Sequence, residues 1–153
     1  MIVGIVGHGS DKFDNTTKSI AFQIIRDILS GSNVTGFTSG RSPVGGIDIW
    51  SEQIADELEI QKQVFPPKQH KWDAEYGFKQ RNLDIARTSN ILYVILVRNY
   101  PDEYSGKTWL KDGKPFCYHC AKHDVPSDHV KSGACWTAWE AKKLDREVYW
   151  YII

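Results

Sequence analysis

The sequence predicts a three-layer α/β fold, in which helices cover both faces of a doubly wound, parallel, five-stranded sheet. Five short apolar, β-rich runs alternate with segments whose apolar residues recur at helical spacing. Crossovers of this length favour parallel strands. The run from Ile91 to Val97 is continuously apolar, which is typical of a strand covered on both faces by helices.

The chain begins with a strand, a turn and a helix. Met1 to Val6 is apolar and ends at the glycine turn Gly7-His8-Gly9-Ser10. Any residue from Asp14 to Thr17 can cap the following helix, whose apolar positions recur up to Ser30-Gly31. Those positions are Ile20, Ile24, Ile25, Ile28 and Leu29.

A second strand and helix follow, and then a third strand. Val34 to Thr38 predicts the strand, Ser39 to Gly46 a loop, and Ile47 to Leu58 the helix. Gln61 to Phe65 predicts the third strand. Three acidic side chains of the helix are expected on its wet side or facing a cleft: Asp48, Glu52 and Asp56.

The second half contains two further units and a long polar stretch. We expect a helix from Tyr76 to Ser89 ahead of the strand Ile91 to Val97, and a helix from about Gly133 ahead of the strand Glu147 to Ile153. Residues 98–131 are polar and punctuated by Gly and Pro. A loop of that length is usually functional or separately stabilised, so we interpret it as an insertion before the last helix.

The expected strand order is 3-2-1-4-5, which opens a crevice between strands one and four. Ligands of doubly wound sheets bind beyond the carboxyl ends of the strands, where the strand order reverses. Three segments should meet there: the turn after the first strand, the Ser39 to Gly46 loop, and the helix start near Gly133.

Length and charge limit the class of protein. A chain of 153 residues fits one domain, so we expect residues 1–153 to form a single domain. The 19 basic residues balance the 19 acidic ones, which argues against an extended nucleic-acid face. The longest apolar run is far shorter than the roughly 18–20 residues of a membrane span. The first residues read as a strand rather than a signal peptide, so we expect a cytoplasmic protein with no membrane partner.

Two glycine-rich segments can bind an anion. In Gly7-His8-Gly9-Ser10, backbone amides and a hydroxyl can cradle a phosphate, or the glycines serve only to turn the chain. The loop containing Gly40, Gly45 and Gly46 leads into a helix N-terminus, where the dipole favours negative charge. No Lys-Ser/Thr follows these glycines, which disfavours ATP hydrolysis of the Walker type. The alternative is a tight turn with a well-capped helix.

Three cysteines lie between residues 117 and 135, a poor disulfide framework but a good metal site. Cys117, Cys120, His129 and Cys135 form the pattern C-x2-C-x8-H-x5-C, which suits Zn²⁺ in a knuckle-like insertion. His119 and His123 are alternatives for the nitrogen ligand. In the competing interpretation, the cysteines are small buried hydrophobes and the histidines are incidental.

Several motifs together resemble the SLOG superfamily, which groups the lonely-guy nucleoside-monophosphate phosphoribohydrolases, the DNA-processing protein A domain, and the YspA-like and YpsA-like proteins. The resemblance covers nearly the whole chain outside residues 98–131. It implies a Rossmann-like fold and a nucleotide-type ligand. The motifs are Ser39-Gly40, Gly45-Gly46-Ile47-Asp48, Arg81-Asn82, Thr88-Ser89-Asn90, and Ser132-Gly133 with Thr137 and Glu140.

The resemblance also implies roles for individual residues. The ligand-binding positions are Ser39, Gly40, Gly45, Gly46, Asp48, Ser132, Gly133 and Thr137. The catalytic pair of the phosphoribohydrolases falls on Arg81 and Glu140. Such a pair is chemically reasonable, because a carboxylate stabilises an oxocarbenium-like sugar and Arg binds phosphate in a bidentate manner. In the phosphate motif, Ala134 and Trp136 replace two family glycines, which argues against the same close backbone approach.

Three functions therefore remain as hypotheses. The first is binding of a nucleotide or nucleotide-derived ligand in the crevice. The second is N-glycosidic hydrolysis of a nucleoside 5′-monophosphate by Glu140 and Arg81, and the third is a zinc-stabilised interaction module without a ligand pocket. The resemblance also implies a homodimer.

Overall fold

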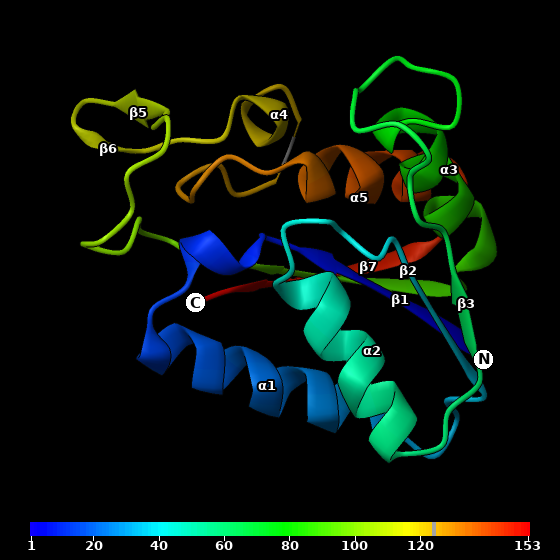
Figure 1. The fold of residues 1–153 in the computed structure, drawn as a ribbon. Coiled ribbons are helices and arrows are strands. Elements are labelled where there is room, and N and C mark those ends of the chain that lie inside the picture. Colours follow the sequence, from blue (N-terminus) through cyan, green and yellow to red (C-terminus); the bar gives the residue numbers. More distant parts are fainter. Residues whose placement is uncertain (124) are drawn as a thin grey trace.

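Five parallel strands form the central sheet of the computed structural model, which describes residues 1–123 and 125–153 (Figure 1). The spatial order is β3-β2-β1-β4-β7, which confirms the predicted order 3-2-1-4-5 and the doubly wound α/β fold. The strands are β1 (Ile2–Gly7), β2 (Gly36–Ser39), β3 (Lys62–Val64), β4 (Ile91–Leu96) and β7 (Glu147–Ile152).

The register of β1 places it at the centre of the sheet. Val3 pairs with Phe37 of β2 on one side and with Ile91 of β4 on the other. Val3 and Ile5 are buried in the apolar cluster on one face and Val6 in the cluster on the other, as expected for a central parallel strand covered on both faces. The strand order reverses between β1 and β4: β2 and β3 lie on one side of β1, and β4 and β7 lie on the other.

Helices cover both faces of the sheet. Helices α1 (Asn15–Leu29) and α2 (Ile47–Glu57) lie on one face, and α3 (Phe78–Thr88) and α5 (Gly133–Lys143) lie on the other (Figure 1). Helix α1 begins with a capping box, in which the Asp14 carboxylate accepts from the Thr17 N–H at 2.7 Å and the Thr17 hydroxyl oxygen accepts from the Asp14 N–H. Each face buries its own apolar cluster.

The stretch 98–131 is not a bare loop. It contains a small antiparallel hairpin, β5 (Leu110–Lys111) with β6 (Lys114–Pro115), and the four-residue helix α4 (Tyr118–Ala121). These elements lie beside α5 on the α3/α5 side of the sheet (Figure 1). Residue 124, within the predicted insertion, lies outside the described residues.

Some local expectations were wrong. Ile20 is 42% exposed, because α1 turns this position away from the sheet while Ile25 and Leu29 fill the core. Glu52 is buried rather than solvent-exposed, because its carboxylate pairs with Arg41. Helix α3 begins at Phe78 rather than at Tyr76, whose φ of 55° is incompatible with a helix.

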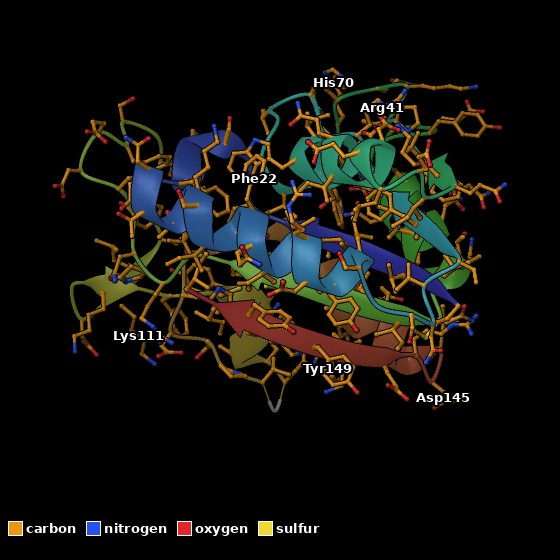
Figure 2. The ribbon with its side chains drawn as sticks, turned by 90° about the horizontal axis from the view of Figure 1, so that it is seen from below. Phe22, Arg41, His70, Lys111, Asp145 and Tyr149 are labelled. Carbon is orange, nitrogen blue, oxygen red and sulfur yellow. The ribbon has the colours of Figure 1, made fainter. Side chains whose placement is uncertain are left out.

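The outer strand β7 is less covered than the centre. Tyr149 lies on β7 at the edge of the sheet, away from Phe22 of α1 (Figure 2), and its side chain is exposed. Across the described ranges, every helix is too short or too polar to cross a membrane.

Candidate functional site

A crevice of about 340 Å³ lies beyond the carboxyl end of the sheet. Its walls come from the turn after β1, the loop between β2 and α2, one side of α3, and the first turns of α5. The three segments that the sequence placed there therefore meet, and α3 adds a fourth. This is the location that the reversal of strand order favours for a ligand.

The predicted ligand residues divide into two groups. One group lines the crevice: Gly7, His8, Gly9, Asp48, Ser132, Gly133 and Thr137, together with Arg81. The other group lies outside the lining set and supports the loops: Ser10, Ser39, Gly40, Gly45 and Gly46. Glu140 also lies outside the residues found to line the crevice, and its carboxylate pairs with Lys143 at 3.0 Å.

The supporting glycines allow two loops to touch. Gly46 has a φ of 80°, and a Cβ at this position would lie 2.6 Å from the backbone of Gly9 and Ser10. The Ser10 hydroxyl donates to the Val44 carbonyl at 2.8 Å, and this hydrogen bond links the same two loops to each other. These residues shape the wall of the crevice from behind.

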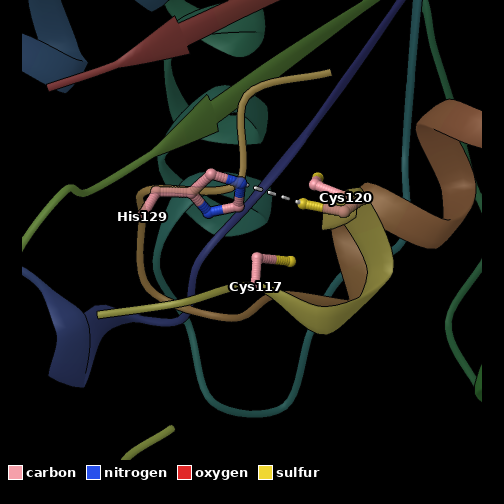
Figure 3. A group of neighbouring side chains, drawn as sticks. Cys117, Cys120 and His129 are labelled. Atoms are coloured by element: carbon pink, nitrogen blue, oxygen red, sulfur yellow. Dashed lines mark hydrogen bonds between the residues drawn. The ribbon is translucent and has the colours of Figure 1, made fainter. Parts of the chain in front are cut away.

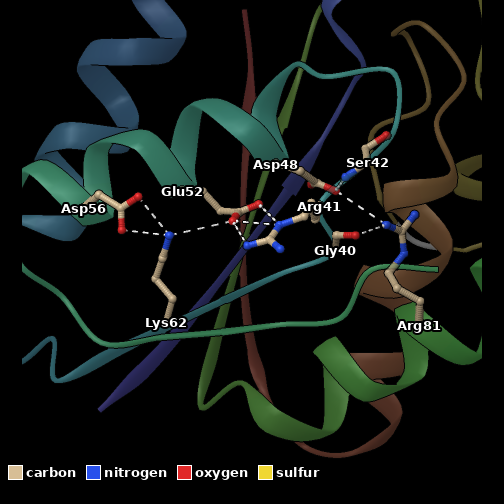
Figure 4. Close-up of polar contacts among 8 residues, drawn as sticks. All are labelled: Gly40, Arg41, Ser42, Asp48, Glu52, Asp56, Lys62 and Arg81. Carbon is tan, nitrogen blue, oxygen red and sulfur yellow. Dashed lines mark hydrogen bonds and ion pairs between the residues drawn. The ribbon is translucent and has the colours of Figure 1, made fainter. Parts of the chain in front are cut away.

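Asp48 and Arg81 form the buried polar centre of this wall. The Arg81 Nη1 donates to the Gly40 carbonyl at 2.7 Å and lies 3.6 Å from Oδ2 of Asp48, which also accepts from the Ser42 N–H at 3.1 Å (Figure 4). Burial raises the pKa of Asp48 to about 6, although Arg81 and the Ser42 amide favour the charged form. Burial also lowers the pKa of Arg81. Among the described residues, the buried Nε of Arg81 has no hydrogen-bond partner.

A second ion pair anchors the same loop from outside. The guanidinium of Arg41 contacts the buried carboxylate of Glu52 at 2.7 Å, and Lys62 lies 3.8 Å from that carboxylate (Figure 4). Arg41 has a φ of 46°, so the loop turns sharply at this residue. Two acidic residues of α2, Asp48 and Glu52, are thus buried and hold the loop in position.

His8 uses both ring nitrogens within the protein. Its Nδ1 accepts from the Val97 N–H at 3.0 Å, so the proton lies on Nε2, which donates to the Val130 carbonyl at 3.0 Å. Burial lowers the pKa of His8 to about 4 and keeps the ring neutral. His8 therefore ties the ends of β1 and β4 to the segment before α5.

The first turns of α5 form the opposite wall. Ser132 caps the helix, because its hydroxyl oxygen accepts from the Ala134 N–H at 3.0 Å. Thr137 is 1% exposed and lines the crevice, yet its hydroxyl has no partner among the described residues. Buried hydroxyls are normally hydrogen-bonded, so this one lacks a partner that such groups usually have.

The sequence motifs gave no ligand role to Lys12, Lys131, Trp72, Phe78 or Asn82. All five line the crevice. Lys131 directly precedes the Ser132 cap, a position that could have indicated it. The two aromatics come from α3 and the segment before it, and only the tertiary fold brings them here.

The four predicted metal ligands form one buried cluster. The sulfurs of Cys117, Cys120 and Cys135 and a ring nitrogen of His129 all lie within 4.8 Å of one another. Figure 3 shows Cys117, Cys120 and His129 within this cluster. His129 is part of this group, whereas His123 stacks on Trp139 with ring centroids 3.5 Å apart. The cluster can hold a metal ion.

The surroundings of the cluster favour a cation. His129 donates from Nδ1 to the Val130 carbonyl at 2.8 Å, which leaves the Nε2 lone pair directed toward the Cys135 sulfur at 3.9 Å. Hydrogen bonds from Cys120 and Cys135 lower the pKa of Cys117, and the same contacts raise the pKa values of the two donors. The Cys117 thiol therefore loses its proton most readily, while the raised pKa values of Cys120 and Cys135 favour their protonated forms.

Comparisons with known proteins support the fold class. No family model matches the chain, and no curated protein matches it. One solved structure is similar, the molybdenum cofactor carrier protein MCP from Chlamydomonas reinhardtii, with 13% sequence identity and a TM-score of 0.57. The match covers 97% of this chain and 74% of that one. The chain therefore has a Rossmann-like α/β fold, shared with a carrier protein.

Proposed function

We propose that the crevice binds a nucleotide or a nucleotide-derived cofactor, with its phosphate at the N-terminal end of α5. The observation that carries this proposal is the buried, unpartnered hydroxyl of Thr137 beside that helix end. The amide end of a helix attracts anions. Lys12 and Lys131 also line the crevice and add positive charge.

The rest of the crevice suits the remainder of such a ligand. Trp72 and Phe78 offer aromatic faces on which a base can stack, and Asp48 and Asn82 offer polar groups to its edge or to a ribose. The free Nε of Arg81 is a further donor. The likeness to a molybdenum cofactor carrier supports a small cofactor as the kind of ligand.

Binding has more support than hydrolysis. Glu140 lies two turns along α5 from the helix start and pairs with Lys143, outside the residues that line the crevice. The motifs still favour membership of the SLOG superfamily, with residues 1–153 as one nucleotide-binding domain. In this interpretation the chain carries a ligand rather than cleaving it.

For the cluster we propose a structural Zn²⁺ held by Cys117, Cys120, His129 and Cys135. Three thiolates and one imidazole form a closed tetrahedral set, typical of structural zinc. All four residues are buried. Elemental analysis of protein purified without chelator should give about one equivalent of zinc, and less than about a tenth of an equivalent would contradict this ligand set.

Calorimetry with AMP, GMP and adenosine tests the proposed ligand. We expect a nucleoside monophosphate to bind and adenosine to bind at least about tenfold more weakly, because hydrogen bonds to charged groups contribute about 1.5–3 kcal/mol. Thr137→Val removes only the hydroxyl and should weaken monophosphate binding by a similar factor. Thr108→Val, on the exposed insertion, is the matched control. Equal binding of AMP and adenosine, or an unaffected Thr137→Val, would contradict the proposal.

A further inference from the structure

We propose that the metal centre positions the anion-binding end of α5, so that metal binding and ligand binding strengthen each other. The proposal rests on the proposed function of the crevice. It adds that His8, which lines the crevice, is a positioning residue joined to the metal ligand His129 through one shared carbonyl. Two independent connections carry it.

The first connection is the helix itself. Cys135 is the third residue of α5, between Ala134 and Thr137, which both line the crevice. The Cys135 sulfur lies in the cluster, on the side where α4 packs against α5. An ion bound there fixes the first turn of α5 from behind, while the other side of that turn faces the crevice.

The second connection is a hydrogen-bond network around Val130. The Val130 carbonyl accepts from His129 Nδ1 at 2.8 Å and from His8 Nε2 at 3.0 Å. Its N–H donates to the Val97 carbonyl at 3.1 Å, and the Val97 N–H donates to His8 Nδ1. The network is buried and contacts both walls of the crevice, because His8 belongs to one wall and residues 131–134 directly follow Val130.

The metal would determine the geometry of this network. A metal-bound His129 has a fixed ring orientation, and its Nδ1–H then fixes the direction of the Val130 carbonyl. In the described residues of the insertion before it, regular structure is limited to two-residue strands and a four-residue helix. Without an ion, the segment 129–134 loses one of its few fixed points, and the crevice loses a defined wall.

Thermodynamic linkage makes the coupling reciprocal. If the metal raises ligand affinity by a given factor, the ligand raises metal affinity by the same factor. We expect a factor of about ten, within the usual range of such couplings. Release of the metal would then favour release of the ligand.

The test measures AMP affinity by calorimetry in zinc-loaded protein, in chelator-treated protein, and after zinc is restored. We expect the Kd to rise about tenfold without zinc and to recover with it. His129→Gln should behave as the zinc-free protein does, and His119→Gln, outside the cluster, should behave as the wild type. Equal AMP affinity with and without zinc would overturn the proposal.

A second pair of variants keeps all four metal ligands. His8→Leu removes the hydrogen bonds to Val130 and Val97, whereas His8→Gln retains an amide donor and a carbonyl acceptor. His8→Leu should still bind one equivalent of zinc but bind AMP about tenfold more weakly, and His8→Gln should recover part of the affinity. Wild-type AMP affinity in His8→Leu would overturn the role of His8, even if the zinc-free protein failed to fold.

Hydrogen exchange separates failure of the coupling from failure of the proposed function. If AMP binds neither form, the nucleotide proposal fails, and the exchange rates of the amides of residues 131–134 decide the coupling. Faster exchange without zinc would support a metal-positioned helix end. Exchange that is unchanged on zinc removal would overturn it.

Discussion

The two walls of the crevice differ in how they are held in place. One wall, formed by residues 7–9 and 40–48, rests on the parallel sheet, on glycines that let two loops touch, and on two ion pairs whose carboxylates are buried. The other wall, formed by residues 129–137, follows a long insertion and contains two members of the Cys/His cluster. The sheet is sufficient to position the first wall. The second is joined to the end of the sheet by hydrogen bonds of Val130 with Val97 and His8, and the proposed metal ion would add a crosslink.

The largest expected effect is on the second wall, from removal of zinc. At free zinc about a thousandfold above its Kd, the ion stabilises the folded state by about 4 kcal/mol. For a chain of this size that corresponds to a decrease in Tm of roughly 8–16 °C on chelation. Thermal unfolding with and without chelator measures this. An unchanged Tm after chelation would show that the second wall, like the first, is stable without a metal ion.

Acidification should loosen the contact between the walls through His8. Its pKa falls from 6.5 in the unfolded chain to about 4 in the folded protein. The unfolded state therefore binds more protons between these values, and stability is lost as the pH falls from about 6.5 to 4. The loss amounts to about 3 kcal/mol, since one pKa unit corresponds to 1.36 kcal/mol.

The measurement is the stability difference between wild type and His8→Gln across this pH range, from urea unfolding. Comparison with the variant is needed because the raised pKa of Asp48 acts with the opposite sign and stabilises the fold as the pH falls toward 4. Protonation of the cluster affects both proteins equally. We expect the advantage of the wild type to shrink by about 3 kcal/mol, and a constant difference would argue against a buried neutral His8.

Gly46→Ala, in the first wall, should lower the free energy of unfolding by about 2–3 kcal/mol. The new Cβ would meet the backbone of the turn after β1, and the positive φ of Gly46 adds strain. Gly113→Ala is the matched control, because Gly113 also has a positive φ but has open space around its Cβ position. The control should cost only about 1 kcal/mol. Equal costs in urea unfolding would mean that close loop packing does not support this wall.

The smallest effect is expected beyond both walls, at Glu140. Glu140→Gln removes a surface pair with Lys143, worth less than about 0.5 kcal/mol. Its AMP affinity should equal that of the wild type. Calorimetry, with an assay for released base, checks both points, and loss of a base-releasing activity in this variant would restore the hydrolase hypothesis.

The fold followed from local patterns in the sequence. Strand order, the position of the crevice and the grouping of Cys117, Cys120, His129 and Cys135 were all predicted, because periodicity, crossover length and the C-x2-C spacing are local signals. The exposure of Ile20 and the burial of Glu52 were not predicted. Helical periodicity indicates which residues share a helix face, but it does not show which other segments pack against that face.

Much of the site depends on contacts between distant residues. The bond from His8 to Val130 joins positions 122 residues apart, and the contact from Arg81 to Gly40 joins positions 41 apart. Neither has a sequence signature. The phosphate motif shared with the SLOG superfamily predicted that both Thr137 and Glu140 belong to the site, but only Thr137 lines the crevice. Glu140 lies nearly one turn further along α5 than Thr137, and it pairs with Lys143 outside the crevice.

Amide chemical shifts recorded while zinc-loaded protein is titrated with AMP would map the binding site directly. We expect the largest changes on both walls together, at Gly9 and Lys12 on one side and at Gly133 and Ala134 on the other. Adenosine should cause much smaller changes at the second pair. Absence of changes at millimolar AMP, or changes confined to the β7 edge around Tyr149, would contradict the central claim that this crevice binds a nucleotide-type ligand.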